Sequence, residues 1–189
     1  FWFVQSQADV FIAGRWFDDP HKLGIYTTSL FLTQILVQKF VPALNEVAFS
    51  AYARMQDDAA GAATASSGSV RLIMIAAMPF YLGLAATSEP LVLVALGEKW
   101  AEAAPVVHLL ALAMPFMTLQ ILFAPATDAR GRPGIGAQNS AIGALLLPGA
   151  FLVGVHWGLT GMAIAWIAIW PVYLAITAWR SLPVIGLSV

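Results

Sequence analysis

The sequence predicts an all-α polytopic membrane protein, from its composition, its long apolar segments and the short loops between them. Apolar residues make up 60% of the 189 residues and charged residues only 10%, with a mean hydropathy of +0.79. A typical soluble domain has about 25% charged residues. The net charge of −1 provides no basic surface, so we exclude nucleic-acid binding. The absence of cysteine excludes disulfides, thiolate catalysis and cysteine metal sites.

The first three apolar segments are predicted to be helices over residues 1–17, 24–48 and 69–86. Residues 1–13 form only about 20 Å of helix, against a hydrocarbon core of about 30 Å. Because the chain also begins with Phe1 rather than Met, we interpret it as a fragment whose first helix is cut short. The longest loop is expected at residues 52–68. There Arg54, Asp57 and Asp58 precede a run of alanine, glycine and serine, and either aspartate could cap the next helix.

The other three helices are predicted over residues 105–126, 135–157 and 159–179. Residues 131–134, with the sequence GRPG, are typical of a turn. Gly136, Ser140 and Ala144 repeat a small residue at every fourth position, a pattern that permits close helix packing. Residues 180–189 are interpreted as a connector. The six helices form a single membrane domain over residues 1–189, and the short loops make consecutive helices antiparallel neighbours.

The distribution of lysine and arginine predicts the orientation in the membrane. Five basic residues fall at one end of the predicted helices and three at the other, with Lys39 left out as intramembrane. The two groups are Arg54, Arg71, Arg130, Arg132 and Arg180, and Arg15, Lys22 and Lys99. By the positive-inside rule, the end with five basic residues faces the cytoplasm.

Each of the five complete predicted helices has a proline in its interior. Proline removes a backbone hydrogen bond and bends a helix. A membrane tolerates this only where neighbours or water satisfy the freed carbonyl. These prolines are candidate hinges, with static bends as the alternative, and they are Pro42, Pro79, Pro115, Pro148 and Pro171.

The second predicted helix carries the main candidate site. At 100° per residue, its amide and charged side chains fall within an arc of about 140°, and apolar residues fill the opposite side. The members of this arc are Gln34, Gln38, Lys39, Asn45 and Glu46. A charge at mid-membrane costs about 2.5–3.5 kcal/mol on insertion scales, so such residues usually face a cavity, a partner or a substrate path. The pattern therefore favours a transporter with a polar cavity.

Lys39 is the leading candidate for substrate binding, because an ammonium group within a membrane span can hold a phosphate or an acidic sugar. A structural ion pair, or snorkelling of the side chain to the interface, is the alternative. Glu46 lies about 10 Å further along the axis, as either a headgroup-level or a proton-binding carboxylate. Asp9 marks the first helix as a second partly polar wall, and its carboxylate is a candidate partner for Lys39 across the hairpin.

No motif in the sequence indicates catalysis or metal binding. Neither a phosphate-binding GxxxxGK[ST] pattern nor a GxSxG nucleophile motif occurs. The two adjacent aspartate pairs have no third ligand at a useful spacing, and His108 and His156 are isolated, as helix-end groups are. We therefore expect no enzyme activity, no metal and no cofactor.

Four segments, in their order and spacing, resemble a known family. They are ADVFIAGRWF with LGIY (residues 8–26), VQKFVPALNEVAF with ARMQDD (37–58), EPLVLVALGEKWAEAAPVVHLLAL (89–112) and GLTGMAIAW (158–166). On these segments the chain resembles Wzx-type polysaccharide flippases, especially the lipopolysaccharide and colanic-acid exporter branch of the multidrug/oligosaccharidyl-lipid/polysaccharide exporter superfamily. Ser50 and Ala51 depart from the Phe-Pro-like step expected after the second helix.

The resemblance implies a two-lobe transporter in the bacterial cytoplasmic (inner) membrane, of which this chain begins the second lobe. It implies alternating access around a polar cavity. It also implies a lipid-linked oligosaccharide of the undecaprenyl pyrophosphate type as cargo, moved for cell-surface polysaccharide biosynthesis. Membrane lipids and a polysaccharide polymerase or glycosyltransferase are the further partners that it implies.

Alternatives remain open at this point. A cation-coupled multidrug exporter of the same superfamily would bind protons or sodium at Asp9 or Glu46. A membrane-embedded glycosyl-transferring enzyme would need a large outer loop with catalytic groups, whereas the longest predicted loop is a small-residue segment on the inner side. A purely structural subunit is disfavoured by the cost of Lys39 in lipid.

Overall fold

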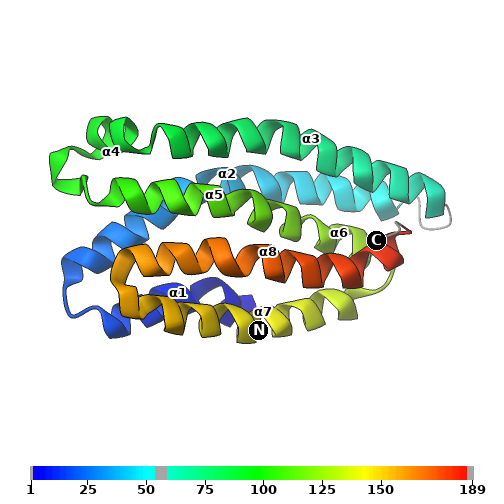
Figure 1. Cartoon of the computed structure of the whole chain (residues 1–189). Coiled ribbons are helices and arrows are strands. Elements are labelled where there is room, and N and C mark those ends of the chain that lie inside the picture. Colours follow the sequence, from blue (N-terminus) through cyan, green and yellow to red (C-terminus); the bar gives the residue numbers. More distant parts are fainter. Residues whose placement is uncertain (1, 54–58, 187–189) are drawn as a thin grey trace.

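The computed structural model is an elongated bundle of helices whose axes lie along the length of the bundle (Figure 1). The structure describes residues 2–53 and 59–186. In chain order the helices are α1 (Trp2–Trp16), α2 (Pro20–Ala53), α3 (Ala59–Ala86), α4 (Ser88–Leu96), α5 (Ala103–Ile121), α6 (Phe123–Ala129), α7 (Pro133–Gly154) and α8 (Gly158–Ile185). Two 3-10 turns, η1 (Glu98–Trp100) and η2 (Val155–Trp157), lie between α4 and α5 and between α7 and α8.

Helices α5 and α8 form the centre of the bundle. They pack against each other, and α5 also contacts α2 and α3 while α8 contacts α7. Figure 1 shows α3 along one side of the bundle and α1 with α7 along the opposite side. The fully buried side chains of the two central helices are mostly apolar or aromatic, and they include Leu110, Met114, Met162 and Tyr173.

Three stretches of the described residues are long and apolar enough to cross a membrane. They are Ala63–Ala86, Ala103–Ala129 and Pro133–Ile185. The last contains both α7 and α8, which turn back on each other at η2 (Figure 1). The predicted all-α membrane fold is therefore confirmed.

The start of α3 differs from the sequence prediction. The helix begins at Ala59, not near residue 69, so the predicted loop is wrong over residues 59–68. Alanine has the highest helix propensity, and this segment is rich in it. The Ser67 and Ser69 hydroxyls donate to helix carbonyls four residues earlier, each at 2.9 Å. Arg54, Asp57 and Asp58 lie outside the described residues.

The earlier start of α3 also moves Arg71 away from the end of the bundle. Arg71 lies twelve residues after Ala59 and fifteen before Ala86, near the middle of α3. It therefore does not belong with the basic residues assigned to the cytoplasmic end. Without Arg71, that group has four members against three, so the orientation argument loses most of its margin.

The predicted helix over residues 105–126 is divided into α5 and α6 at Leu122. Pro125 explains the break, because it has no N–H and its ring clashes with the carbonyl of the residue four positions earlier, Ile121. The Leu122 N–H instead bonds to the Leu119 carbonyl at 3.2 Å. The sequence prediction also missed α4 and η1, which fill the connection between α3 and α5.

All five candidate hinge prolines lie inside helices that continue through them. Pro42 is in α2, Pro79 in α3, Pro115 in α5, Pro148 in α7 and Pro171 in α8. A single conformation does not test movement about them, so the hinge role stays a prediction. In α8 the helix also continues to Ile185, so the predicted connector is wrong over residues 180–185.

The turn from α7 to α8 is built on glycine. Gly158 has a φ of 69°, a left-handed conformation that side chains rarely adopt. Gly154 and Gly161 face each other across the turn, and a Cβ on Gly154 would lie 2.6 Å from the Gly161 carbonyl oxygen. The backbones of the two helices are therefore in direct contact here.

Candidate functional site

The predicted cavity-lining residues of α2 lie on the side that turns away from the bundle core. The opposite side is formed by buried residues that include Tyr26, Ser29, Thr33 and Val37. Gln38, Lys39 and Glu46 are exposed, and Gln34 and Asn45 are half-buried. The structure therefore places Gln38, Lys39 and Glu46 on the open side of α2, with Gln34 and Asn45 at its margin, where the Asn45 Oδ1 is buried. The contact of these five residues with a substrate stays a prediction.

Lys39 lies far from both ends of α2. It follows Pro20 by nineteen residues and precedes Ala53 by fourteen, which places it about 28 Å and about 21 Å from the two ends. No residue in the described part of the chain forms an ion pair with it. Next to it, the Gln38 amide donates to Gln34 Oε1 at 2.9 Å. The amides of Gln34 and Gln38 thus bond to each other, while the ammonium group has no partner among the described residues.

Asp9 does not meet Lys39, so that predicted pairing is wrong. The Asp9 side chain is only 3% exposed, and the Tyr26 hydroxyl donates to its Oδ2 at 3.1 Å. The Trp166 Nε1–H in turn donates to the Tyr26 oxygen at 3.0 Å. Tyr26 precedes Lys39 on α2 by thirteen residues, or about 20 Å along the axis. Asp9 therefore joins α1 to α2 and α8 inside the bundle.

A buried carboxyl group in apolar surroundings is costly unless it is hydrogen-bonded. The chain from Trp166 through Tyr26 supplies neutral donors to Asp9, and hydrogen bonds in such a chain strengthen one another. Ionisable groups of this kind inside membrane proteins often carry protons or bind ions. The arrangement can therefore hold a proton or a small cation.

A second buried network centres on the hydroxyl of Tyr173 in α8. This oxygen accepts hydrogen bonds from Gln5 at 3.1 Å and Gln120 at 3.4 Å, and it donates to the Asn139 carbonyl at 3.0 Å. Gly143 makes room for it, because a Cβ there would lie 2.9 Å from Gln5 Cδ and from the Tyr173 oxygen. Helices α1, α5, α7 and α8 are linked through this one hydroxyl.

The close approach seen on α7 is at Gly143, which is not one of the three residues of the predicted repeat. At Gly136, the first residue of the predicted small-residue repeat, a Cβ would meet only Asp128 Oδ1, at 3.7 Å. The residues of α7 that are buried include Asn139, Gly143 and Leu147, spaced by four along the helix. The interior face of α7 is therefore set by Gly143.

Arg180 joins α8 to α7 at the end of the hairpin opposite the turn. Its Nε donates to Asn139 Oδ1 at 3.0 Å, and its guanidinium group also bonds to Gln138 Oε1. Asn139 Nδ2 donates to the Ser181 hydroxyl at 3.3 Å. These bonds hold the start of α7 against the end of α8.

Sequence reasoning missed both buried networks. One available signal was the spacing of Trp166, Trp170, Tyr173, Thr177 and Ser181, which places them on one face of α8. The rings of Trp166 and Trp170 stack with centroids 5.5 Å apart, and Trp170 and Tyr173 meet edge to face with centroids 5.6 Å apart. A polar and aromatic face on an apolar helix indicates interior hydrogen bonding.

His156 lies in η2 at the end of α7, as predicted, whereas His108 is not a helix-end group, because it is the sixth residue of α5. His108 Nδ1 is 2.9 Å from the Ala85 carbonyl oxygen, and the His156 ring packs against Trp16 with centroids 4.8 Å apart. Over residues 2–53 and 59–186, the structure contains no group of three or more His, Cys, Asp or Glu residues that could hold a metal ion.

Comparison with known proteins finds one matching family and two relatives of similar sequence. The profile of a family described as "Polysaccharide biosynthesis protein" matches residues 1–105, more than half of the chain. The teichuronic acid biosynthesis protein TuaB of Bacillus subtilis (strain 168) is 26% identical over 162 residues, which cover 86% of this chain and 33% of TuaB. The succinoglycan biosynthesis transport protein ExoT of Rhizobium meliloti (strain 1021) is 27% identical over 167 residues, which cover 88% and 34%. The chain spans about a third of the length of these relatives, and no solved structure matches it.

Proposed function

Because the chain belongs to the polysaccharide biosynthesis protein family, we propose that it begins the second lobe of a flippase-type transporter in the cytoplasmic (inner) membrane of a bacterium. The cargo is a lipid-linked oligosaccharide of the undecaprenyl pyrophosphate type, moved for cell-surface polysaccharide biosynthesis. The names of the two relatives support this, since both refer to the biosynthesis of a polysaccharide and one to its transport. The protein acts as a transporter and not as an enzyme.

The open polar side of α2 is the observation that carries the proposal. A sugar headgroup needs many hydrogen-bond partners, and the amides of Gln34 and Gln38 supply both donors and acceptors. The ammonium group of Lys39, which forms no ion pair with the residues that the structure describes, supplies a positive charge for the pyrophosphate or for an acidic sugar. Asn45, half-buried on α2, extends this surface along the helix, whereas Asp9 is buried inside the bundle on the opposite side of α2 and is not part of it.

Replacement of Lys39 tests its role. We expect Lys39→Ala in the full-length transporter to lower export by about tenfold or more, because a hydrogen bond to a charged group contributes about 1.5–3 kcal/mol. Polysaccharide export in a complementation assay, at equal protein levels, is the measurement. Lys22→Ala is the matched control, since Lys22 is an exposed lysine at the start of the same helix. Unchanged export with Lys39→Ala would remove Lys39 from the mechanism.

The absence of cysteine from the chain makes thiol labelling a direct test of water access. Single cysteines at positions 34, 38 and 45 should react with a water-soluble maleimide in at least one state of the full-length carrier. Cysteines at Thr33 and Val37, which are buried in the bundle, should react far more slowly. Equal protection at all five positions in every state would contradict a water-filled cavity.

A second candidate function is cation-coupled drug export, which the buried carboxyl group of Asp9 favours. It predicts drug efflux that depends on a proton or sodium gradient and is lost with Asp9→Asn. Glu46, the other acidic candidate, is exposed on α2. Flippase function instead predicts a requirement for polysaccharide precursors and association with a polymerase or glycosyltransferase, which co-purification of the full-length protein would test.

A further inference from the structure

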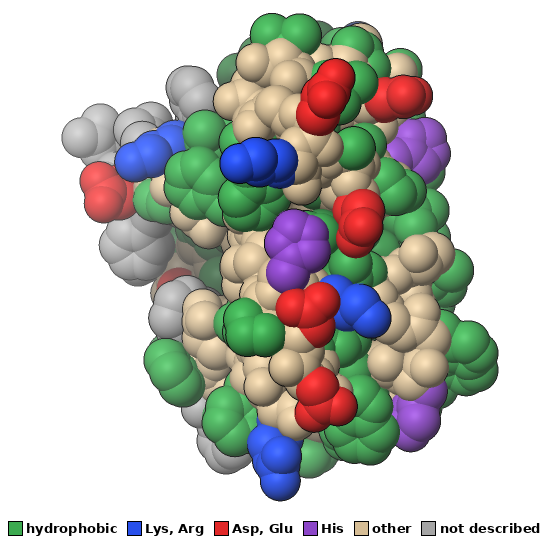
Figure 2. Space-filling model, turned by 90° about the vertical axis from the view of Figure 1, so that its left-hand side faces the viewer, with side chains coloured by type: hydrophobic (Ala, Val, Ile, Leu, Met, Phe, Trp, Pro, Cys, Tyr) green, Lys and Arg blue, Asp and Glu red, His purple; other side chains and the backbone are tan. Residues whose placement is uncertain are grey.

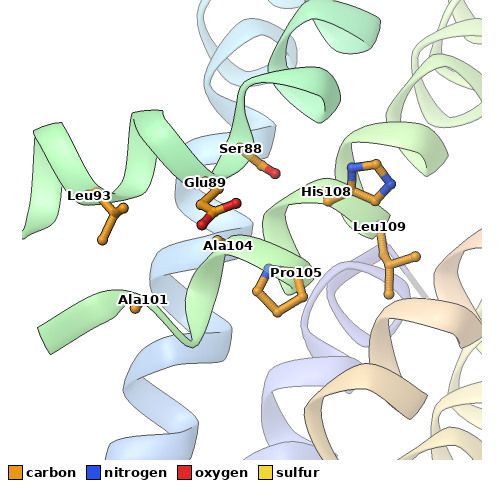
Figure 3. Close-up of a pocket in the computed structure, with 8 residues that line it drawn as sticks. All are labelled: Ser88, Glu89, Leu93, Ala101, Ala104, Pro105, His108 and Leu109. Carbon is orange, nitrogen blue, oxygen red and sulfur yellow. The ribbon is translucent and has the colours of Figure 1, made fainter. Parts of the chain in front are cut away.

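A pocket of about 480 Å³ lies where α4 begins beside the first turns of α5 (Figure 3). It is at the end of the bundle that Figure 2 faces, where acidic, basic and histidine side chains gather on the surface. Its polar lining comes from Ser88, Glu89 and His108, and its apolar lining includes Leu93, Pro105 and Leu109. The pocket is on a different part of the molecule from the polar side of α2.

The polar lining of the pocket offers hydrogen-bond acceptors, and Glu89 gives it one negative charge. Glu89 is exposed in the first turn of α4. His108 Nδ1 lies 2.9 Å from the Ala85 carbonyl oxygen. Because a carbonyl oxygen only accepts, Nδ1 carries the hydrogen of this bond, and Nε2 lies on the side of the ring away from Glu89 (Figure 3). The Glu89 carboxylate and the Ser88 hydroxyl oxygen therefore suit the pocket to a positively charged group that donates hydrogen bonds.

The apolar part of the pocket reaches along α5. Leu109 follows Ala103, the first residue of α5, by six residues, or about 9 Å along the helix axis. Leu93 faces the pocket from α4 and is 38% exposed. The pocket therefore combines a polar mouth with an aliphatic wall, as an amphiphilic ligand requires.

The position of the pocket along the chain places it at the level of lipid headgroups. Two stretches apolar enough to cross a membrane, Ala63–Ala86 and Ala103–Ala129, flank α4 and η1. Glu89 lies three residues after the first stretch, and Leu109 lies within the second. The headgroup regions add about 10–15 Å to the hydrocarbon core of about 30 Å. Glu89 is thus at headgroup depth and Leu109 at the depth of the acyl chains.

We propose that this pocket binds a phospholipid with a primary ammonium headgroup, such as phosphatidylethanolamine. The ammonium group donates to Glu89 and to the Ser88 hydroxyl oxygen, and the first acyl carbons pack on Pro105 and Leu109. A metal ion is disfavoured because the described residues contain no group of three ligands. An oligosaccharide is disfavoured because no Trp, Tyr or Phe ring lines the pocket. This inference does not depend on the proposed transport function.

Lipid retention by the full-length protein tests the proposal. Protein delipidated in detergent is mixed with vesicles of phosphatidylethanolamine, phosphatidylcholine or phosphatidylglycerol, and bound lipid is measured by native mass spectrometry. We expect phosphatidylethanolamine to be retained most, because the choline headgroup has the charge without N–H donors and the glycerol headgroup has neither. Glu89→Gln should lower its retention about two- to fivefold, as for a partly exposed ion pair.

Glu98→Gln is the matched control, because Glu98 is exposed in η1 at the same end of the bundle and does not line the pocket. It should leave phosphatidylethanolamine retention unchanged. Equal retention by the Glu89→Gln and Glu98→Gln proteins would overturn the proposal, as would equal retention of phosphatidylglycerol and phosphatidylethanolamine. Displacement of the lipid by soluble phosphoethanolamine at matched concentration would overturn the role of the aliphatic wall.

Discussion

Two polar regions of this apolar bundle, the interior network at Tyr173 and the open side of α2, differ in how their hydrogen bonds are satisfied. Inside, the Tyr173 hydroxyl makes three hydrogen bonds to groups on α1, α5 and α7. On the open side of α2, Gln34 and Gln38 bond only to each other and Lys39 has no partner among the described residues. Polar groups with partners from other helices fix packing, whereas groups without such partners are available to water or to a ligand.

Gly143→Ala should give the largest effect on stability. The added Cβ would lie 2.9 Å from Gln5 Cδ and the Tyr173 oxygen, and overpacking of this kind costs about 1–3 kcal/mol. Denaturation of the full-length protein in detergent measures the loss. Gly149→Ala is the control, because nothing lies within 4 Å of a Cβ there and alanine is the better helix former. Equal stability of the two variants would contradict close packing at Gly143.

Tyr173→Phe should give the next largest effect. It removes one hydroxyl and leaves the Gln5 amide and the Asn139 carbonyl without this partner inside the bundle, at a cost of about 1–3 kcal/mol. A double-mutant cycle with Gln5→Leu measures the coupling, which we expect to be at least about 0.5 kcal/mol. Additive effects of the two substitutions would show that the interior network does not act as a unit.

Gln38→Ala should have the smallest effect on stability and a clear effect on transport. Its single bond to Gln34 is on an exposed helix surface, where such pairs contribute about 0.2–0.5 kcal/mol. Unfolding and export are measured on the same full-length variant. If Gln38→Ala lowered stability as much as Tyr173→Phe and left export unchanged, the α2 amides would serve packing. The two regions would then not differ in role.

The sequence alone predicted the features that depend on local pattern. Composition and apolar runs predicted an α-helical membrane protein, and the 3.6-residue period predicted that Gln34, Gln38 and Lys39 share the open side of α2. The predicted start of α3 was too late, because a run of alanine, glycine and serine is also typical of loops. The alanine in this run favours helix. The effect of Pro125 on the preceding turn was also available from local rules and was overlooked.

The features that could not be predicted depend on which helices meet. Tyr26 and Trp166, which share the hydrogen-bond chain to Asp9, are 140 residues apart, and no local pattern pairs them. The choice between Gly136 and Gly143 as the close-packed glycine of α7 depends on where α1 and α8 lie. Long-range geometry therefore decided the interior polar groups, and helical periodicity decided the exterior ones.

The glycine contact between α7 and α8 has a mechanical consequence. The hairpin is joined backbone to backbone near Gly154 and Gly161, and it is held at its far end by the hydrogen bonds of Arg180 to Gln138 and Asn139. Two helices fastened at both ends rotate and translate as one rigid body. We therefore expect any shape change of this bundle to be a displacement of α2 or α3 past an unchanging α7–α8 pair, and not a parting of that pair.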